Sequence, residues 1–244
     1  MERFSRTRFL LGDTAMEKLK NAHVAVFGLG GVGGYVVEAL ARSGIGQLTL
    51  VDHDKISLSN INRQILATVD TVGMEKAEAA KARVNAINPS CEVNAICDFF
   101  GPNTRHLFDF TKYDYVVDAI DTLSPKLALI KGAMDRGIPL VSSMGAGAKC
   151  DPTLMEIKDI AKTHHCPLAH MLRKRLHKIG IKRGFWAVFS PEPVREGAMI
   201  LCEEQNKKSN VGTISYIPAL FGIGCASVVV RDLIGEFTNE TKTE

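Results

Sequence analysis

The amino-acid sequence predicts an α/β fold: a doubly wound, mainly parallel, Rossmann-like sheet with a C-terminal α+β extension. A short apolar run at residues 24–27 meets Gly28 and leads into a helical pattern at 35–42. Further apolar runs alternate with helical patterns up to residue 143, which is typical of a parallel sheet with right-handed crossovers. With 244 residues and 45% apolar composition, the chain is long enough to bury a sizeable core.

The local pattern predicts each element in turn. An amphipathic opening helix is expected at 3–20. Strands are expected at 24–27, 48–52, 91–97, 113–121 and 139–143, with helices at 35–42, 74–87 and 125–136. Later, we expect a hairpin with strands at 186–190 and 199–202, a polar and mobile segment at 203–210, a helix at 217–235 and a frayed tail at 238–244. Residues 1–150 are predicted to form the nucleotide-binding region, and 151–244 to complete the same domain with a basic helical insert, late strands and a last helix.

Composition excludes several classes of protein. The net charge of +3 does not by itself indicate a nucleic-acid binder. Six cysteines without any C-x-x-C spacing argue against a compact zinc site and against a disulfide scaffold. The N-terminal residues lack the apolar core of a signal peptide, so a cytoplasmic protein is expected. The apolar segment at 217–230 is too short to span a bilayer. It predicts a buried helix, and its contact with a dimer partner or a membrane stays open.

The glycines after the first strand predict a phosphate site. Without side chains, they let backbone N–H groups approach phosphate oxygens at the start of a helix, where the helix dipole adds positive charge. Asp52 ends the next apolar run, where an acid can bind a ribose hydroxyl. The alternative is a tight strand-to-helix turn with no ligand.

The polar residues that follow favour ATP chemistry over hydride transfer. The long loop at 55–76 offers Asn60, Arg63 and Lys76, and a later strand ends in Asp121. Cations stabilise departing pyrophosphate, and a carboxylate at a strand end can hold Mg²⁺. A dehydrogenase needs neither feature.

Six motifs follow one another along the first part of the chain: Arg3-Phe-Ser-Arg6, Gly28-Leu-Gly-Gly-Val-Gly33, Asp52-His-Asp54, Ser59-Asn-Ile-Asn-Arg-Gln64, Val72-Gly-Met-Glu-Lys76 and Asp118-Ala-Ile-Asp121. Taken in this order, they closely resemble the ubiquitin-activating-enzyme-like superfamily, which adenylates carboxylates with Mg-ATP. The resemblance implies that ATP is bound by Gly28, Gly30, Gly31, Gly33, Asp52, Asp54, Ser59, Asn60, Arg63, Gln64, Lys76 and Asp121. It also implies that Asp121 holds Mg²⁺, and that Arg63, Lys76, Asp121 and Arg6 are catalytic, with Arg6 crossing a homodimer interface.

Each of these residues also has a plain structural alternative. Arg6 could be a solvated helix residue, and Lys76 a surface lysine. Asn60 and Arg63 could cap a loop. Asp118 is expected to be structural rather than catalytic.

The second half of the chain carries four further motifs: Gly145-Ala-Gly-Ala-Lys-Cys-Asp-Pro-Thr153, Asp159-Ile-Ala-Lys-Thr163, Pro167-Leu-Ala169 and Arg173-Lys-Arg-Leu176. With them the chain resembles the tRNA threonylcarbamoyladenosine dehydratase family. The resemblance implies ATP-dependent cyclisation of the threonylcarbamoyl group on a tRNA adenosine, with loss of water. The basic stretch at 151–183 is then expected to contact tRNA through Arg173, Lys174, Arg175, Lys178, Lys182 and Arg183. A merely solvated helix face is the alternative.

Other functions remain open at this stage. An adenylyltransferase for a small ubiquitin-like sulfur-carrier protein is the main alternative, although such enzymes usually carry two zinc-binding C-x-x-C pairs. Cys166, Cys202 or Cys225 could accept sulfur from a transfer partner protein. His164 and His165 are poor metal ligands, because no other acid or thiol with matching spacing joins Cys166. A non-catalytic nucleotide-binding module is the third class.

Overall fold

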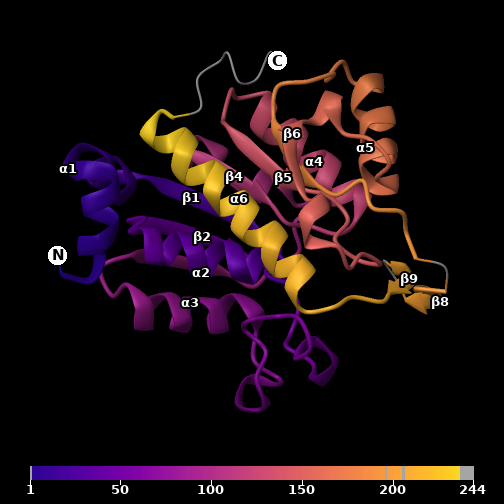
Figure 1. Ribbon diagram of the computed structural model, residues 1–244, viewed down its shortest axis with the longest axis horizontal. Coiled ribbons are helices and arrows are strands. Elements are labelled where there is room, and N and C mark those ends of the chain that lie inside the picture. Colours follow the sequence, from indigo (N-terminus) through magenta and orange to yellow (C-terminus); the bar gives the residue numbers. More distant parts are fainter. Residues whose placement is uncertain (1, 196, 205–206, 237–244) are drawn as a thin grey trace.

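Figure 1 shows the computed structural model, which describes residues 2–195, 197–204 and 207–236. Within these residues, a seven-stranded sheet forms the middle layer. In pairing order its strands are β3 (Glu92–Ile96), β2 (Gln47–Val51), β1 (His23–Phe27), β4 (Tyr115–Asp118), β5 (Leu140–Ser143), β7 (Trp186–Phe189) and β6 (Glu156–Asp159). Neighbouring strands are parallel except β6, which runs antiparallel to β7 at the edge. The predicted doubly wound, mainly parallel sheet is confirmed.

Helices cover both faces of the sheet. One face carries α1 (Ser5–Asn21), α2 (Gly33–Ser43), α3 (Lys76–Ile87) and α6 (Tyr216–Ile234), and the other carries α4 (Leu123–Met134) and α5 (Pro167–Lys178). Because both faces are covered, central strands are apolar along their whole length. In β1, Val24 and Val26 pack toward the α2 and α6 side, whereas Ala25 and Phe27 pack toward α4 and α5.

The last helix completes the first of these cores. Figure 1 shows α6 crossing the front of the sheet next to α2. Phe221 and Val228 of this helix are fully buried, and such burial stabilises the fold by roughly 2 kcal/mol for each side chain. A Cβ on Gly222 would lie 2.5 Å from the Val32 carbonyl oxygen, so the two helices need glycine there to pack this closely. By length and composition α6 could cross a membrane, but 50% of it is buried in the fold, as in a core helix.

Two expectations for the second half were wrong. Residues 186–189 do not pair with 199–202; they form β7 inside the main sheet. Instead β8 (Met199–Glu204) pairs with β9 (Lys207–Val211) in a separate antiparallel ribbon, so the described parts of 203–210 belong to strands. The edge strand β6 was not expected at all. The tail predicted at 238–244 lies outside the described residues.

Candidate functional site: the glycine turn and the polar loop beside it

The glycine turn lies where the order of the strands in the sheet reverses, between β1 and β4. It follows β1, next to the turn that follows β4, and this switch point is where open α/β sheets bind ligands. Gly28 has a positive φ of 87°, and a Cβ there would lie 2.8 Å from the Ala119 carbonyl oxygen. A Cβ on Gly33 would lie 1.7 Å from the Gly28 oxygen. Both positions therefore require glycine.

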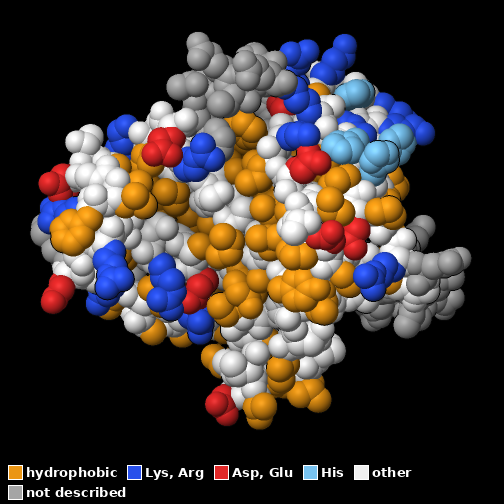
Figure 2. Space-filling model, in the orientation of Figure 1, with side chains coloured by type: hydrophobic (Ala, Val, Ile, Leu, Met, Phe, Trp, Pro, Cys, Tyr) orange, Lys and Arg blue, Asp and Glu red, His pale blue; other side chains and the backbone are white. Residues whose placement is uncertain are grey.

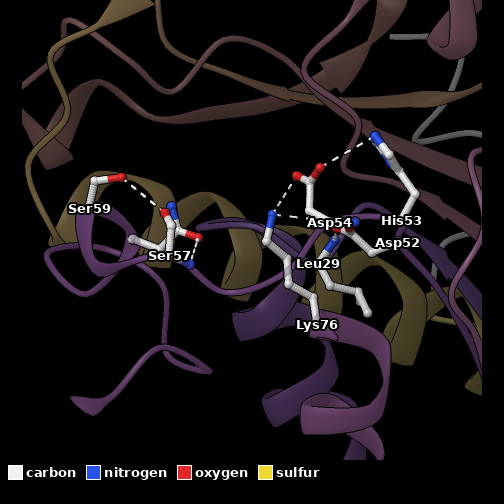
Figure 3. A network of polar contacts seen from close by, with 8 residues as sticks. Leu29, Asp52, His53, Asp54, Ser57, Ser59 and Lys76 are labelled. Carbon is white, nitrogen blue, oxygen red and sulfur yellow. Dashed lines mark hydrogen bonds and ion pairs between the residues drawn. The ribbon is translucent and has the colours of Figure 1, made fainter. Parts of the chain in front are cut away.

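Asp52 ties this turn to the end of β2 (Figure 3). One carboxylate oxygen accepts the Leu29 N–H at 2.6 Å, and the other accepts the Asp54 N–H at 2.8 Å. The residue is only 8% exposed. Each carboxylate oxygen has two lone pairs, so these bonds leave Asp52 able to accept a ribose hydroxyl as well.

Lys76 is a buried cation held between two acids. Its Nζ lies 2.7 Å from Asp54 Oδ2 and 4.0 Å from Asp52 Oδ1, and its side chain is only 7% exposed. This burial excludes the surface-lysine alternative. Asp52, His53 and Asp54 are close enough together to hold a metal ion. Because the Lys76 ammonium already occupies the Asp54 oxygen, we interpret this group as the anchor of the lysine (Figure 3).

The polar loop packs directly on the glycine turn. The Arg63 guanidinium donates to the Ser59 carbonyl oxygen at 2.9 Å, and a Cβ on Gly31 would lie 3.5 Å from Arg63 Cγ. Asn60 is buried, and its Oδ1 accepts the Ser57 N–H at 3.2 Å. Asn60 therefore does cap the loop through its side-chain oxygen, as the structural alternative proposed. This capping bond does not use the N–H donors of the Asn60 amide, which are suited to binding a phosphate.

Gln64 provides a test of whether a ligand fits here. Its Nε2 lies 3.7 Å from the position of a Cβ on Gly30. Its buried Oε1 accepts no hydrogen bond from any described residue. A buried acceptor without a donor is costly, and a bound molecule with an N–H or O–H group would relieve that cost. Together with the glycine cradle, this observation fits a nucleotide.

The two acids after β4 differ in their surroundings. Asp118 is fully buried, 2.6 Å from Lys126 Nζ and 2.5 Å from Ser142 Oγ. Burial raises the pKa of Asp118, while Lys126 and Ser142 act in the opposite direction. Asp118 is therefore structural, as expected. Asp121 is exposed in the same turn, two residues beyond the Ala119 whose carbonyl lies against Gly28. A carboxylate is the kind of ligand that Mg²⁺ prefers, and a metal-binding role for Asp121 stays a prediction.

Arg6 does not join this site within one chain. Phe4, just before α1, packs at the edge of the sheet where β2 begins, since a Cβ on Gly44 would lie 3.6 Å from the Phe4 ring. Arg6 itself is exposed. Among the predicted nucleotide-binding residues outside the turn, Asp52, Arg63 and Gln64 lie against its glycine segment.

The predicted tRNA-binding residues gather on and after α5. This helix buries Ala169, Leu172 and Leu176 and turns its basic residues outward, where Figure 2 shows Lys, Arg and His side chains together. Lys174, Arg175, Lys178, Lys182 and Arg183 are exposed. Arg173 is half-buried and donates to Thr163 Oγ1.

Two of the three candidate sulfur acceptors have little access to solvent. Cys166 and Cys225 are buried, and the side chain of Cys202 lies outside the described residues. Burial raises the pKa of the Cys225 thiol, which disfavours the reactive thiolate.

A buried clamp that the sequence did not suggest lies near the site. The Lys149 ammonium donates to the Glu192 carbonyl oxygen at 2.5 Å, and the Glu192 carboxylate accepts the N–H groups of Cys150 and Asp151 at 2.9 Å. Burial lowers the pKa of Lys149. In the sequence, the feature that could have pointed to this buried lysine is that Lys149 is the one charged residue between 137 and 150. A cavity of about 450 Å³ next to the clamp is lined partly by Asn62, Arg195, Thr213 and Ser215.

Comparisons with known proteins agree with this geometry. The chain is 41% identical over 242 residues to the tRNA threonylcarbamoyladenosine dehydratase of Bacillus subtilis, covering 96% of this chain and 95% of that protein. A crystal structure of the Escherichia coli tRNA N6-threonylcarbamoyladenosine dehydratase in complex with ATP superposes with a TM-score of 0.88 at 38% identity, covering 96% and 95%. The adenylyltransferase and sulfurtransferase of Saccharomyces cerevisiae is 29% identical over 94% of this chain but only 46% of its own length. Residues 4–244 match the ThiF family, and the chain belongs to that family.

Proposed function

We propose that the protein is an ATP-dependent tRNA threonylcarbamoyladenosine dehydratase. The observation that carries the proposal is the switch-point site, where the glycine turn lies against Asp52, Arg63 and Gln64, and Asp52 lies 4.0 Å from the buried Lys76 ammonium. Relatives that this chain matches over nearly their whole length carry the same name, and one was crystallised with ATP.

The chemistry has two steps. The threonyl carboxylate attacks the α-phosphate of ATP, and the bond to pyrophosphate breaks. The neighbouring carbamoyl group then attacks the carbonyl of the acyl-adenylate, AMP leaves, and the nucleoside has lost one water overall. Because the second step is intramolecular, it needs no nucleophile from the protein. The raised pKa of the buried Cys225 thiol is consistent with that.

Each site residue then has a stated role. The glycine N–H groups and the donors of Asn60 and Arg63 bind phosphate oxygens, and Asp52 binds the ribose. Lys76 stabilises the negative charge that develops as pyrophosphate departs. Asp121 would hold Mg²⁺, which supplies further neutralisation of the phosphates. The cavity lined by Asn62 is the proposed binding place of the substrate's threonylcarbamoyl group.

A direct assay tests the proposal. The full chain is incubated with Mg-ATP and tRNA that carries threonylcarbamoyladenosine, and the nucleosides are examined by mass spectrometry. We expect one AMP for each nucleoside that becomes lighter by one water. An unchanged nucleoside, alongside an active relative as control, would overturn it.

The sulfur-carrier alternative is less well supported. The matched adenylyltransferase and sulfurtransferase is less similar, and this chain spans under half of it. Pyrophosphate exchange stimulated by a carrier protein with a diglycine tail, and not by tRNA, would revive that alternative together with a sulfur-transfer partner.

The surroundings of the site support further parts of the proposal. We expect tRNA to contact the exposed basic residues of α5, a second copy of the chain to supply Arg6, and the protein to reside in the cytoplasm. Figure 2 shows a band of hydrophobic side chains over α6 and the loop below it, where a second copy could pack.

A further inference from the structure

We infer that a groove along α4, on the opposite face of the sheet from α6, binds a single-stranded segment of the RNA substrate. The inference deepens the proposed function and rests on it. The groove lies between the short helical turn η4 (Arg105–Leu107) and the end of α5, and it encloses a cavity of about 570 Å³.

The groove combines an apolar floor with a basic rim. Phe108, Leu127 and Ile179 contribute apolar surface, and Arg105, His106, Lys131 and Arg136 contribute the basic groups. Flat bases pack on apolar surface while cations bind the phosphates between them, so this combination suits unpaired RNA. An acidic peptide would use the rim but would leave the floor without flat groups to cover it.

The rim keeps an excess of positive charge. Lys131 Nζ lies 2.6 Å from Asp135 Oδ2, and Arg105 Nη2 lies 3.9 Å from the same oxygen, so one acid is shared by two cations. Arg136 is held in place, 5.6 Å above the Phe110 ring and hydrogen-bonded to the Gly132 carbonyl oxygen. Side chains that are already ordered lose less entropy on binding.

The groove borders both the basic helix and the helix that follows the Asp121 turn. Its lining includes Ser124 in the first turn of α4, three residues after Asp121, and Ile179, which directly follows Lys178 of α5. An RNA strand that contacts α5 can therefore continue along α4 toward the turn that carries Asp121.

The test measures tRNA binding by the full chain, with fluorescence anisotropy as the readout, at a series of salt concentrations. The Arg105→Gln/Lys131→Gln variant should bind tRNA roughly 5- to 30-fold more weakly near 0.1 M salt. The plot of log K against log salt should become shallower by roughly 1.4 to 1.8, that is, about 0.7 to 0.9 for each lost phosphate contact. ATP affinity should not change.

A matched control removes the same charges elsewhere. Lys20 and Arg231 each lie beside an acid, on α1 and α6 across the sheet. Lys20→Gln/Arg231→Gln should bind tRNA like the wild type. Arg105→Lys/Lys131→Arg, which keeps both charges, should restore the wild-type slope.

Each outcome is decisive. If the wild type dehydrates tRNA while the groove variant binds tRNA unchanged, the groove proposal is wrong and the proposed function stands. If the wild type leaves tRNA unmodified, the proposed function fails, and the binding series still decides whether the groove takes RNA. Polyglutamate that displaces tRNA from the wild type, but not from the groove variant, would identify an acidic-peptide site and overturn the proposal.

Discussion

At the glycine turn, Gly30 and Gly33 differ in whether the surrounding atoms leave space for a methyl group. A Cβ on Gly33 would meet the Gly28 carbonyl oxygen at 1.7 Å, whereas on Gly30 it would meet Gln64 Nε2 at an ordinary 3.7 Å. Gly33 thus serves the fold, and Gly30 leaves open space for a ligand.

The corresponding alanine variants should therefore differ in kind. Gly33→Ala should lower the free energy of unfolding by about 2–4 kcal/mol, because backbone must move. Gly30→Ala should change it by less than about 0.5 kcal/mol, yet weaken ATP binding roughly tenfold as the methyl group meets the phosphates. Urea denaturation and calorimetric ATP titration measure both, and wild-type ATP affinity in Gly30→Ala would contradict this assignment.

Lys76 offers a second prediction at this scale. Lys76→Met should lower kcat by roughly 10²- to 10³-fold, since it removes a charge placed for the departing pyrophosphate. AMP release at saturating ATP and tRNA measures it. Lys81→Met, a lysine farther along the same helix, should keep wild-type activity. Equal losses in both variants would show that α3 is simply sensitive to substitution.

At the nucleotide site the sequence predicted the glycine turn but not the side-chain partners around it. Glycine spacing predicted the tight turn at Gly28 and Gly33, and Asp52 at the end of the next strand hydrogen-bonds to it. The nucleotide-binding roles of Asp52 and Asp121 stay predictions. The pairing of Lys76 with Asp54 depends on how α3 packs, which no spacing shows. Buried Lys126 and Lys149 were missed for the same reason: their partners are distant in sequence.

Between elements, one acid joins α2 to α3. Glu38 is 9% exposed and accepts hydrogen bonds from Arg42 in its own helix and from Arg83 of α3. Burial alone would raise the pKa of Glu38, but the two arginines outweigh it and lower that pKa from 4.5. The ionised form of Glu38 is therefore more favoured in the folded protein than in the unfolded chain.

This sign gives a pH prediction. A lowered folded pKa means that stabilisation is present above about pH 4.5 and is lost as the pH falls through the folded value. Glu38→Gln should be less stable than the wild type by about 1 kcal/mol at pH 7, since both arginines are largely solvated. The difference should shrink toward zero near pH 3. Denaturant unfolding at several pH values tests it, and a constant difference would contradict the ion pairing.

The elements predicted wrongly also have a physical explanation. Residues 186–189 are apolar without alternation, which fits a strand buried on both faces rather than half of an exposed hairpin. β6 has one apolar residue in four, because it lies at the edge of the sheet and leaves much of its surface exposed. Its register comes from pairing with β7, a contact that the local sequence does not encode.

For the molecule as a whole, the predicted homodimer has a direct test. Arg6 lies at the edge of the sheet opposite the glycine turn, so only a second copy can bring it to the site. Arg6→Ala and Asp121→Ala should each be nearly inactive. An equal mixture should restore up to about a quarter of wild-type activity, because about half of the dimers are heterodimers and each of these has one intact site in two. Native mass spectrometry verifies that heterodimers form. Their presence without restored activity would count against a shared site.

The position of α6 has a consequence for synthesis of the protein. The larger core is lined by Phe221, Cys225, Val228 and Val229, and α6 is the last described element to leave the ribosome. Until then β4, β5 and β7 present an uncovered apolar face, even though the glycine turn has long been translated. We therefore expect that the nucleotide-binding region of the nascent chain cannot fold stably before α6 has been synthesised. A chain stalled near residue 214 should remain sensitive to protease and dependent on chaperones.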